Sequence, residues 1–276
     1  MQKAPRFSPQ TLKFIEKASR QKKSDWLDRN RADYERYLLE PLQHLARYLK
    51  SELAPIAPGY HFPQKGLGRL KRSELRAKEY GGLYKDWVSY AAARPRVSRF
   101  DHNPNLYLLL QPGEEDGDEV LVAGGLYMPS SRQLRSIREA IAQDASAFER
   151  LFASRSFARH FPGGFSRERI ATRPPRGFDP AHPRIELLKL QAFFVWKPYK
   201  KRDFFSADFP KILAADCAEI IKLNALLDQA IQGIARWREV SPPKPLRRAE
   251  KPRAGDADSL ASRLEGIEAP RRKMDF

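Results

Sequence analysis

Cysteine is nearly absent from this sequence of 276 residues, which contains a single cysteine, Cys217. No intramolecular disulfide can form, which agrees with a reducing compartment. Cys217 falls within an apolar helical pattern, so we interpret it as a buried structural thiol. No apolar run approaches the roughly 18 residues that a membrane helix needs, and the N-terminal MQKAPRFSPQ lacks the apolar core of a signal peptide. We therefore expect a cytoplasmic protein with no membrane span.

Motifs for common catalytic and cofactor sites are also missing. The sequence has no G-x-x-x-x-G-K-[ST] loop, no G-x-G-x-x-G fingerprint and no H-E-x-x-H or C-x-x-C pair. Its five histidines are scattered, with none paired at metal-ligand spacing. Gly163-Gly164-Phe165-Ser166 departs from the G-x-S-x-G nucleophile elbow. We predict no metal and no cofactor, and the sequence indicates neither a reaction nor an oligomeric state.

Positive charge, by contrast, is abundant. The chain has 51 Lys and Arg against 34 Asp and Glu, for a formal net charge of +17. Residues 240–276 hold nine basic and six acidic residues, so most of the excess belongs to the rest of the chain. A field of this sign attracts phosphates, nucleic acid or anionic surfaces. A basic, solvated surface with no dedicated partner is the alternative.

Hydrophobic periodicity predicts an α+β fold. Ser8-Pro9 indicates a helix start, with Ser8 as the N-cap, and Pro41 is expected to kink or break the second helix. Gly124-Gly125 indicates a bulge or a close backbone approach within a strand. One expected helix begins at residue 9, and three more span about 31–53, 132–152 and 209–237. The expected strands span 105–111, 119–127 and the end of 185–196.

The order of these elements favours an antiparallel or mixed sheet flanked by helices. We assign residues 1–239 to a single α+β domain. Residues 240–276 are rich in proline and charge and lack aromatic residues until Phe276, so we expect a disordered basic tail there.

The most distinctive stretch is GLGRLKRSELRAKEYGGLYKDWV, residues 66–88. Residues 69–72 suit a short strand, and residues 73–80 suit either a helical turn or an irregular loop. Three acidic residues stand against six basic ones, and three aromatic residues are interleaved, namely Tyr80, Tyr84 and Trp87. The basic residues are Arg69, Lys71, Arg72, Arg76, Lys78 and Lys85.

Arginine offers a planar fork that pairs with two oxygens at once, and lysine adds a point charge. Interleaved aromatic side chains can stack on a base or a sugar. In the alternative interpretation, the aromatic residues pack in the core and the arginines pair with Glu74, Glu79 and nearby acids. Our predicted anion-binding residues are Arg69, Arg72, Arg76, Tyr84 and Lys85, with Arg173 and Arg176 approaching from the proline-rich loop at 173–184.

Three further segments resemble the DUF2461 family. DWLDRNRADYERYLLEPLQHL (25–45) is similar to its N-terminal pattern, and GGLYMPSSRQLRSIREAI (124–141) to its strand-to-helix segment. RPPRGFDPAHPRIELLKLQAFFVW (173–196) resembles its loop and following strand. The resemblance covers about residues 7–235. It implies a single α+β domain and supplies no reaction.

The Arg-rich central motif is divergent from that family. Arg69, Arg72 and the Tyr84-Lys85 pair match the family pattern. Ser73 stands where the family has Asp, and Gly81-Gly82 replaces part of the segment.

Three functions follow as hypotheses. The first is a cytosolic protein that binds a phosphate-bearing ligand, either a nucleotide or nucleic acid, through the Arg/Lys cluster. The second is an enzyme on a small phosphorylated or carboxylated substrate, with Glu74 or Glu79 as a buried acid/base of raised pKa. The third is a structural or adaptor protein whose arginines are paired internally.

Overall fold

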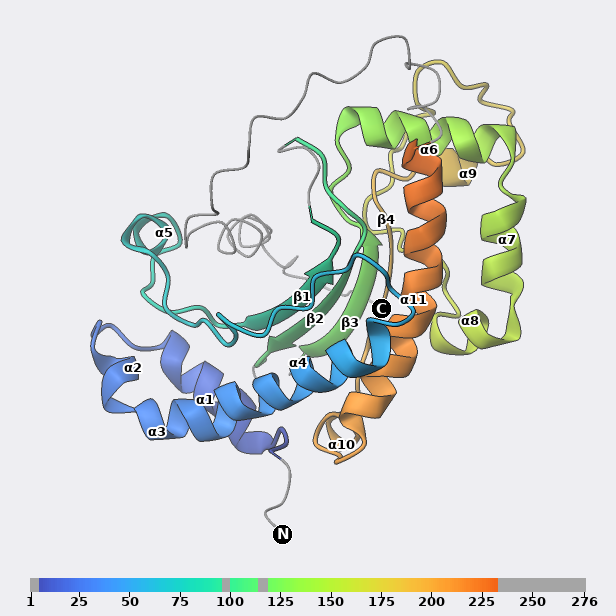
Figure 1. Cartoon of the computed structure of the whole chain (residues 1–276). Helices are drawn as coiled ribbons and strands as arrows, with labels where there is room; N and C mark the ends of the chain where they lie inside the picture. The colour runs from blue at the N-terminus through green and yellow to red at the C-terminus, as the bar shows by residue number, and fades with distance from the viewer. Residues whose placement is uncertain (1–4, 96–99, 114–118, 233–276) are drawn as a thin grey trace, which may run out of the picture. The chain divides into compact units, whose positions relative to one another are not determined.

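The computed structural model describes residues 5–95, 100–113 and 119–232. These residues belong to one compact unit, Met1–Trp237. They combine helices with a four-stranded antiparallel sheet in the order β1-β2-β3-β4 (Figure 1). The α+β class is therefore confirmed, and the sheet is antiparallel rather than mixed. The predicted tail at 240–276 and the domain boundary before it lie outside the described residues and stay predictions.

The elements have the following bounds. The strands are β1 (Val88–Ala93), β2 (Asn105–Gln111), β3 (Glu119–Leu126) and β4 (Phe193–Pro198). The helical elements are α1 (Pro9–Ser19), α2 (Trp26–Arg29), α3 (Arg31–Tyr34), the π-helical turn η1 (Glu35–Leu39), α4 (Glu40–Leu53), α5 (Glu74–Glu79), α6 (Ser131–Gln143), α7 (Ser146–Ala153), α8 (Arg155–His160), α9 (Ile185–Leu188), α10 (Lys201–Phe204) and α11 (Phe209–Gln232). In the ranges that the structure describes, no helix is long and apolar enough to cross a membrane.

A hydrogen bond next to Pro41 joins α1 to the helical run from α3 to α4. Ser8 caps α1 as predicted, and Thr11 completes the cap from the third position. The run from α3 to α4 is continuous rather than broken, and η1 ends at Leu39, two residues before Pro41. Pro41 has no N–H to donate, and the Thr11 hydroxyl donates instead to the carbonyl oxygen of Tyr37 at 2.8 Å. This bond ties α1 to the second helical run.

The helix predicted over 132–152 is wrong as a single helix, because it is divided into α6 and α7. Asp144 has extended backbone angles and ends α6. Its carboxylate accepts from the backbone N–H of Ser146 at 2.8 Å and from the Ser146 hydroxyl at 3.1 Å. Short acidic side chains compete in this way with the helical backbone, and here they start a new helix.

The sheet has one face packed on helices. In Figure 1, α11 and α4 lie against one side of it, and α11 contacts β3 and β2. A Cβ at Gly124 would lie 2.1 Å from Cγ2 of Ile220 on α11 and 2.8 Å from the carbonyl oxygen of Asn105. At Gly125, where φ is +121°, a Cβ would lie 2.3 Å from the carbonyl oxygen of Phe193. The predicted close backbone approach at these glycines is confirmed.

The outer edge of β1 is bridged to the preceding chain at its last residue, Ala93. Residues 61–71 run antiparallel to residues 84–93, with isolated bridges at His61–Ala93 and Lys71–Tyr84. The backbone N–H of His61 donates to the carbonyl oxygen of Ala93 at 2.8 Å.

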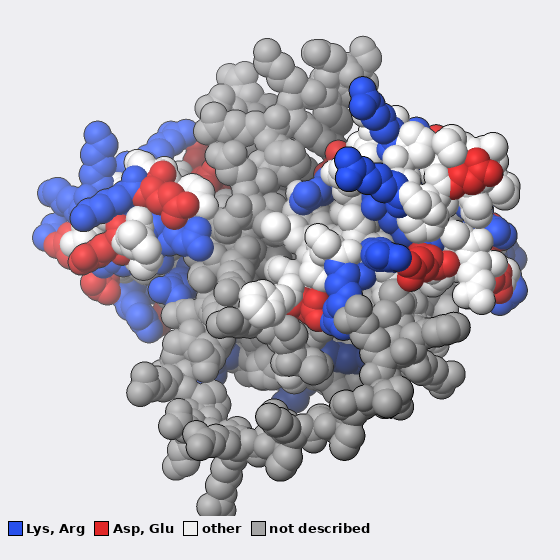
Figure 2. All heavy atoms as spheres, turned by 90° about the horizontal axis from the view of Figure 1, so that it is seen from above, with Lys and Arg blue, Asp and Glu red and all other residues white. Residues whose placement is uncertain are grey.

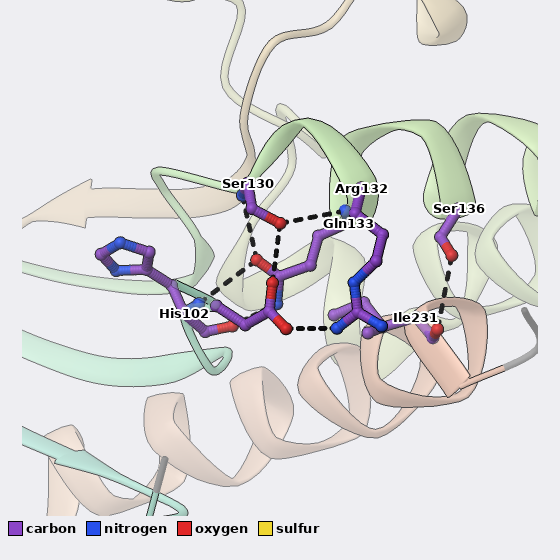
Figure 3. A network of polar contacts seen from close by, with 7 residues as sticks. His102, Ser130, Arg132, Gln133, Ser136 and Ile231 are labelled. Atoms are coloured by element: carbon purple, nitrogen blue, oxygen red, sulfur yellow. Dashed lines mark hydrogen bonds and ion pairs between the residues drawn. The ribbon is translucent and has the colours of Figure 1, made fainter. Parts of the chain in front are cut away.

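The connection into β2 is fastened to the start of α6. Figure 3 shows Gln133 bridging the two segments: its Nε2 donates to the His102 carbonyl at 2.5 Å, and its Oε1 accepts from the His102 N–H at 3.2 Å. Asp101 accepts from the Ser130 hydroxyl at 2.8 Å and from the guanidinium of Arg132. Gln133 is 3% exposed, so this network fixes a buried junction.

Candidate functional site

The Arg-rich stretch folds into a lobe that leads into β1. We call residues 66–87 the basic lobe. The backbone N–H of Arg72 donates to the Leu83 carbonyl, and that of Lys85 donates to the Leu70 carbonyl, both at 2.9 Å. The short strand suggested for 69–72 is thus a single bridge at Lys71. The segment at 73–80 is helical, because α5 is capped by the Ser73 hydroxyl, which accepts from the Arg76 N–H at 3.4 Å.

Arg72 holds together the neck of the basic lobe, where residues 70–72 pair with residues 83–85. Its guanidinium donates to the carbonyl oxygen of Gly82 at 3.3 Å and also to that of Tyr84. The carboxylate of Asp86 lies 3.8 Å away, and only 14% of the Arg72 side chain is exposed. A side chain with these partners acts mainly as a frame for the lobe.

Arg72 and Arg76 also lie beside the same aromatic ring. Each guanidinium carbon is 5.7 Å from the centre of the Tyr80 ring. Arg76 donates to the Tyr80 hydroxyl at 3.1 Å and pairs with Glu79 at 3.5 Å. Because Tyr80 is half-buried and the Arg76 side chain is 24% exposed, this cluster meets solvent along one side.

Tyr84 lies in the core, with 1% of its surface exposed. Its hydroxyl is 3.1 Å from the carbonyl oxygens of both Lys23 and Ser24, to which it can donate, and it accepts from the Leu27 N–H at 3.4 Å. The ring packs edge-on against Trp26, with centres 6.0 Å apart. Tyr84 therefore anchors the basic lobe to the loop and helix at 23–29.

Lys85 is also buried, with 5% of its surface exposed. Its ammonium lies 4.5 Å from the centre of the Trp87 ring, a cation–π distance. Lys71 donates to the Ser24 carbonyl at 2.7 Å. The ammonium groups of Lys71 and Lys85 therefore both lie against groups of the protein itself.

The exposed basic residues of the lobe are Arg69, Lys71 and Lys78. Figure 2 shows Lys and Arg side chains gathered over α5, with Asp and Glu interspersed. Glu74 is exposed, and the Glu79 side chain is 55% exposed. Neither carboxylate has the burial on which the enzyme hypothesis depends.

Arg173 and Arg176 are exposed but lie elsewhere. Residues 169–171 pair with residues 189–191, just before β4. Since β4 and β1 are opposite edges of the sheet, the structure does not bring these two arginines beside the basic lobe (Figure 1).

Sequence reasoning missed a buried carboxylate on α11. Asp216, whose side chain is 1% exposed, lies 2.5 Å from His160 Nδ1, Lys197 Nζ and the Tyr199 hydroxyl. Burial, and then the charge of Asp216, raise the pKa of Tyr199 well above its usual range. An acidic residue inside the apolar stripe of the last helix was the available signal. Its three partners are far apart in sequence, so no motif joins them.

Within residues 5–95, 100–113 and 119–232, no group of three or more His, Cys, Asp or Glu side chains is placed to hold a metal ion. What the basic lobe offers chemically is hydrogen-bond donation and positive charge beside an aromatic ring.

The chain was compared with known proteins. A family model described as "Conserved hypothetical protein (DUF2461)" matches residues 10–225. No curated protein and no solved structure matches the chain. The matched residues run from α1 into α11 and include the basic lobe and the whole sheet. The chain therefore belongs to the DUF2461 family.

Proposed function

We propose that this protein binds a phosphate-bearing ligand, a nucleotide or nucleic acid, on the solvent side of the basic lobe, in the cytoplasm. One observation carries the proposal. Arg72 and Arg76 both lie against the Tyr80 ring, on a lobe that exposes Arg69, Lys71 and Lys78. Guanidinium groups pair with phosphate oxygens, and an aromatic face accepts a base or sugar.

The contacts divide between a frame and a binding surface. Arg72 and Tyr84 hold the lobe together through main-chain carbonyls, so their proposed part is to position the other groups. Arg69 and Lys78 are exposed and are the proposed phosphate contacts. A contribution from Arg173 and Arg176 requires a ligand that extends to the far edge of the sheet, which favours a polymer over a mononucleotide.

The experiment compares two pairs of alanine substitutions by fluorescence anisotropy with a labelled oligonucleotide. Arg69→Ala/Lys78→Ala removes the proposed contacts. Lys13→Ala/Lys50→Ala removes the same charge from exposed sites on α1 and α4. We expect binding to weaken about tenfold in the first variant, roughly the loss of one charge-assisted hydrogen bond. Equal weakening in both variants would mean that only net charge matters, and would contradict the proposal.

A structural role without a ligand is the second candidate. It is favoured by the inward hydrogen bonds of Arg72 and by the burial of Tyr84. Under this alternative, no nucleotide or oligonucleotide raises the melting temperature of the wild-type protein.

A further inference from the structure

Helix α8 packs beside α11 (Figure 1), and two side-chain pairs join the two helices. Ser156 and His160 are four residues apart on α8 and share one side of it. Asp216 and Glu219, three residues apart, share one side of α11. The Ser156 hydroxyl donates to the Glu219 carboxylate at 2.6 Å. His160 Nδ1 lies 2.5 Å from Oδ1 of Asp216. These contacts fix the orientation of the His160 ring against α11.

Asp216 determines which ring nitrogen of His160 carries the proton. The same carboxylate accepts from the Lys197 ammonium at Oδ1 and from the Tyr199 hydroxyl at Oδ2, each at 2.5 Å. An ionised carboxylate only accepts hydrogen bonds, so the neutral imidazole donates to it from Nδ1. The other ring nitrogen, Nε2, then holds a lone pair. Because Nδ1 is held by a buried group while 23% of the His160 side chain is exposed, solvent reaches the ring from the side of Nε2.

A lysine with a well-defined position lies beside this ring. Lys197 and His160 contact the same oxygen of Asp216, so the ammonium and the imidazole are neighbours. The ammonium also lies 5.8 Å from the centre of the Phe161 ring and 5.5 Å from that of the Tyr199 ring, both cation–π distances. The Lys197 side chain is 28% exposed. An ammonium has three protons to donate, so Lys197 can contact Asp216 and an incoming anion together.

We infer that Nε2 of His160 is a phosphorylation site, which takes its phosphoryl group from a small phosphoramidate. The Nε2 lone pair attacks phosphorus and forms a new P–N bond. The P–N bond of the donor breaks, and ammonia leaves with its electron pair. The ring keeps its Nδ1 proton and becomes an imidazolium, whose positive charge Asp216 stabilises. Lys197 donates to the oxygens of the phosphoryl group throughout the transfer.

The charges around His160 favour a phosphoryl group over a neutral electrophile. A phosphoryl group brings negative charge to a position beside the Lys197 ammonium, whereas an acyl group brings none. Lys197 belongs to β4 and Tyr199 directly follows it, at the edge of the sheet opposite β1 and the basic lobe. The phosphorylation site is therefore separate from the lobe. The inference goes beyond the proposed function, and neither depends on the other.

The experiment incubates the full chain with phosphoramidate and follows the phosphorylation of each histidine by peptide mass spectrometry. His61 is the internal reference, because its side chain is exposed. We expect His160 to react at least about tenfold faster than His61, roughly the contribution of one charge-assisted hydrogen bond in the transition state. Phosphorus NMR of the product should show the Nε2 isomer. Equal rates for the two histidines, the Nδ1 isomer, or no phosphoryl group on His160 overturns the inference.

Variants of Lys197 separate the effect of its charge from that of packing. Lys197→Met keeps an unbranched apolar side chain and is expected to slow the phosphorylation of His160 about tenfold, through loss of the charged donor. Lys197→Arg restores the charge and is expected to recover most of the rate. The rate at His61 should be the same in all three proteins. An unchanged rate at His160 in Lys197→Met contradicts the inference. The comparison of His160 with His61 in the wild-type protein stands even where a variant fails to fold.

Discussion

The guanidinium of Arg72 donates to the carbonyl oxygen of Tyr84, across the neck of the basic lobe. Tyr84 is buried and its hydroxyl lies within hydrogen-bonding distance of the carbonyls of Lys23 and Ser24. The charged residue and the aromatic residue therefore form one connected support, which runs from the lobe to the loop before α2. Arg69, three residues earlier, is exposed.

The difference in exposure between Arg72 and Arg69 predicts unequal losses of stability when each is replaced by alanine. Arg72→Ala should lower the free energy of unfolding by about 1.5–3 kcal/mol, because buried carbonyls lose a charged donor. Arg69→Ala should change it by less than about 0.5 kcal/mol, as most exposed substitutions do. Urea denaturation measures both values. Equal effects of the two substitutions would show that Arg72 is not part of the frame.

The close packing around Gly124 predicts that a side chain at this position destabilises the protein. Gly124→Ala should destabilise the protein by about 3 kcal/mol, through overpacking against Ile220 and the Asn105 carbonyl. Gly163→Ala is the matched control, because a Cβ there meets nothing within 4 Å. Both variants can be followed by urea denaturation. Similar midpoints for the two would contradict the close packing of β3 on α11.

The burial of Tyr60 predicts that the folded protein loses stability at alkaline pH. Burial raises the pKa of Tyr60 to about 12, although a hydrogen bond with Asn224 opposes the increase. A pKa raised on folding contributes stability that is complete below the ordinary value of 10 and is lost as the pH rises towards 12.

The test compares the wild-type protein with Tyr60→Phe. Between pH 9 and pH 11 the free energy of unfolding of the wild type should fall by about 1 kcal/mol more than that of the variant. The comparison removes the contribution of every other titrating group common to both proteins. Parallel pH profiles would show that Tyr60 does not titrate with a raised pKa.

Elements with strong local signals were predictable from the sequence. Ser8-Pro9 combines a capping hydroxyl with a preset φ, and the start of α1 was placed correctly. Residues 105–111 form β2 with the predicted bounds, because a short apolar run ends where an acidic sequence begins. These signals lie within a few residues of the elements they define.

Elements that depend on distant partners were harder to predict. The end of α6 at Asp144 depends on a choice between helix and cap that the apolar stripe over 132–152 does not reveal. The expected strands did not include residues 88–93, which form β1, an edge strand paired with β2. On its other side, Ala93 forms an isolated bridge with His61, a pairing that only the tertiary structure shows.

The candidate site shows the same division. The basic lobe was visible because its residues are contiguous. The burial of Tyr84 and Lys85 was not visible, since it depends on Trp26, Trp87 and the loop at 23–29.

The central claim is that the basic lobe binds phosphates, and the salt dependence of binding tests it most directly. The logarithm of the affinity for a single-stranded oligonucleotide is plotted against the logarithm of salt concentration. The two proposed phosphate contacts, Arg69 and Lys78, contribute about −1.4 to the slope, so Arg69→Ala/Lys78→Ala should make the slope shallower by about that amount. A slope near zero for the wild-type protein, or an identical slope for the variant, would contradict the account.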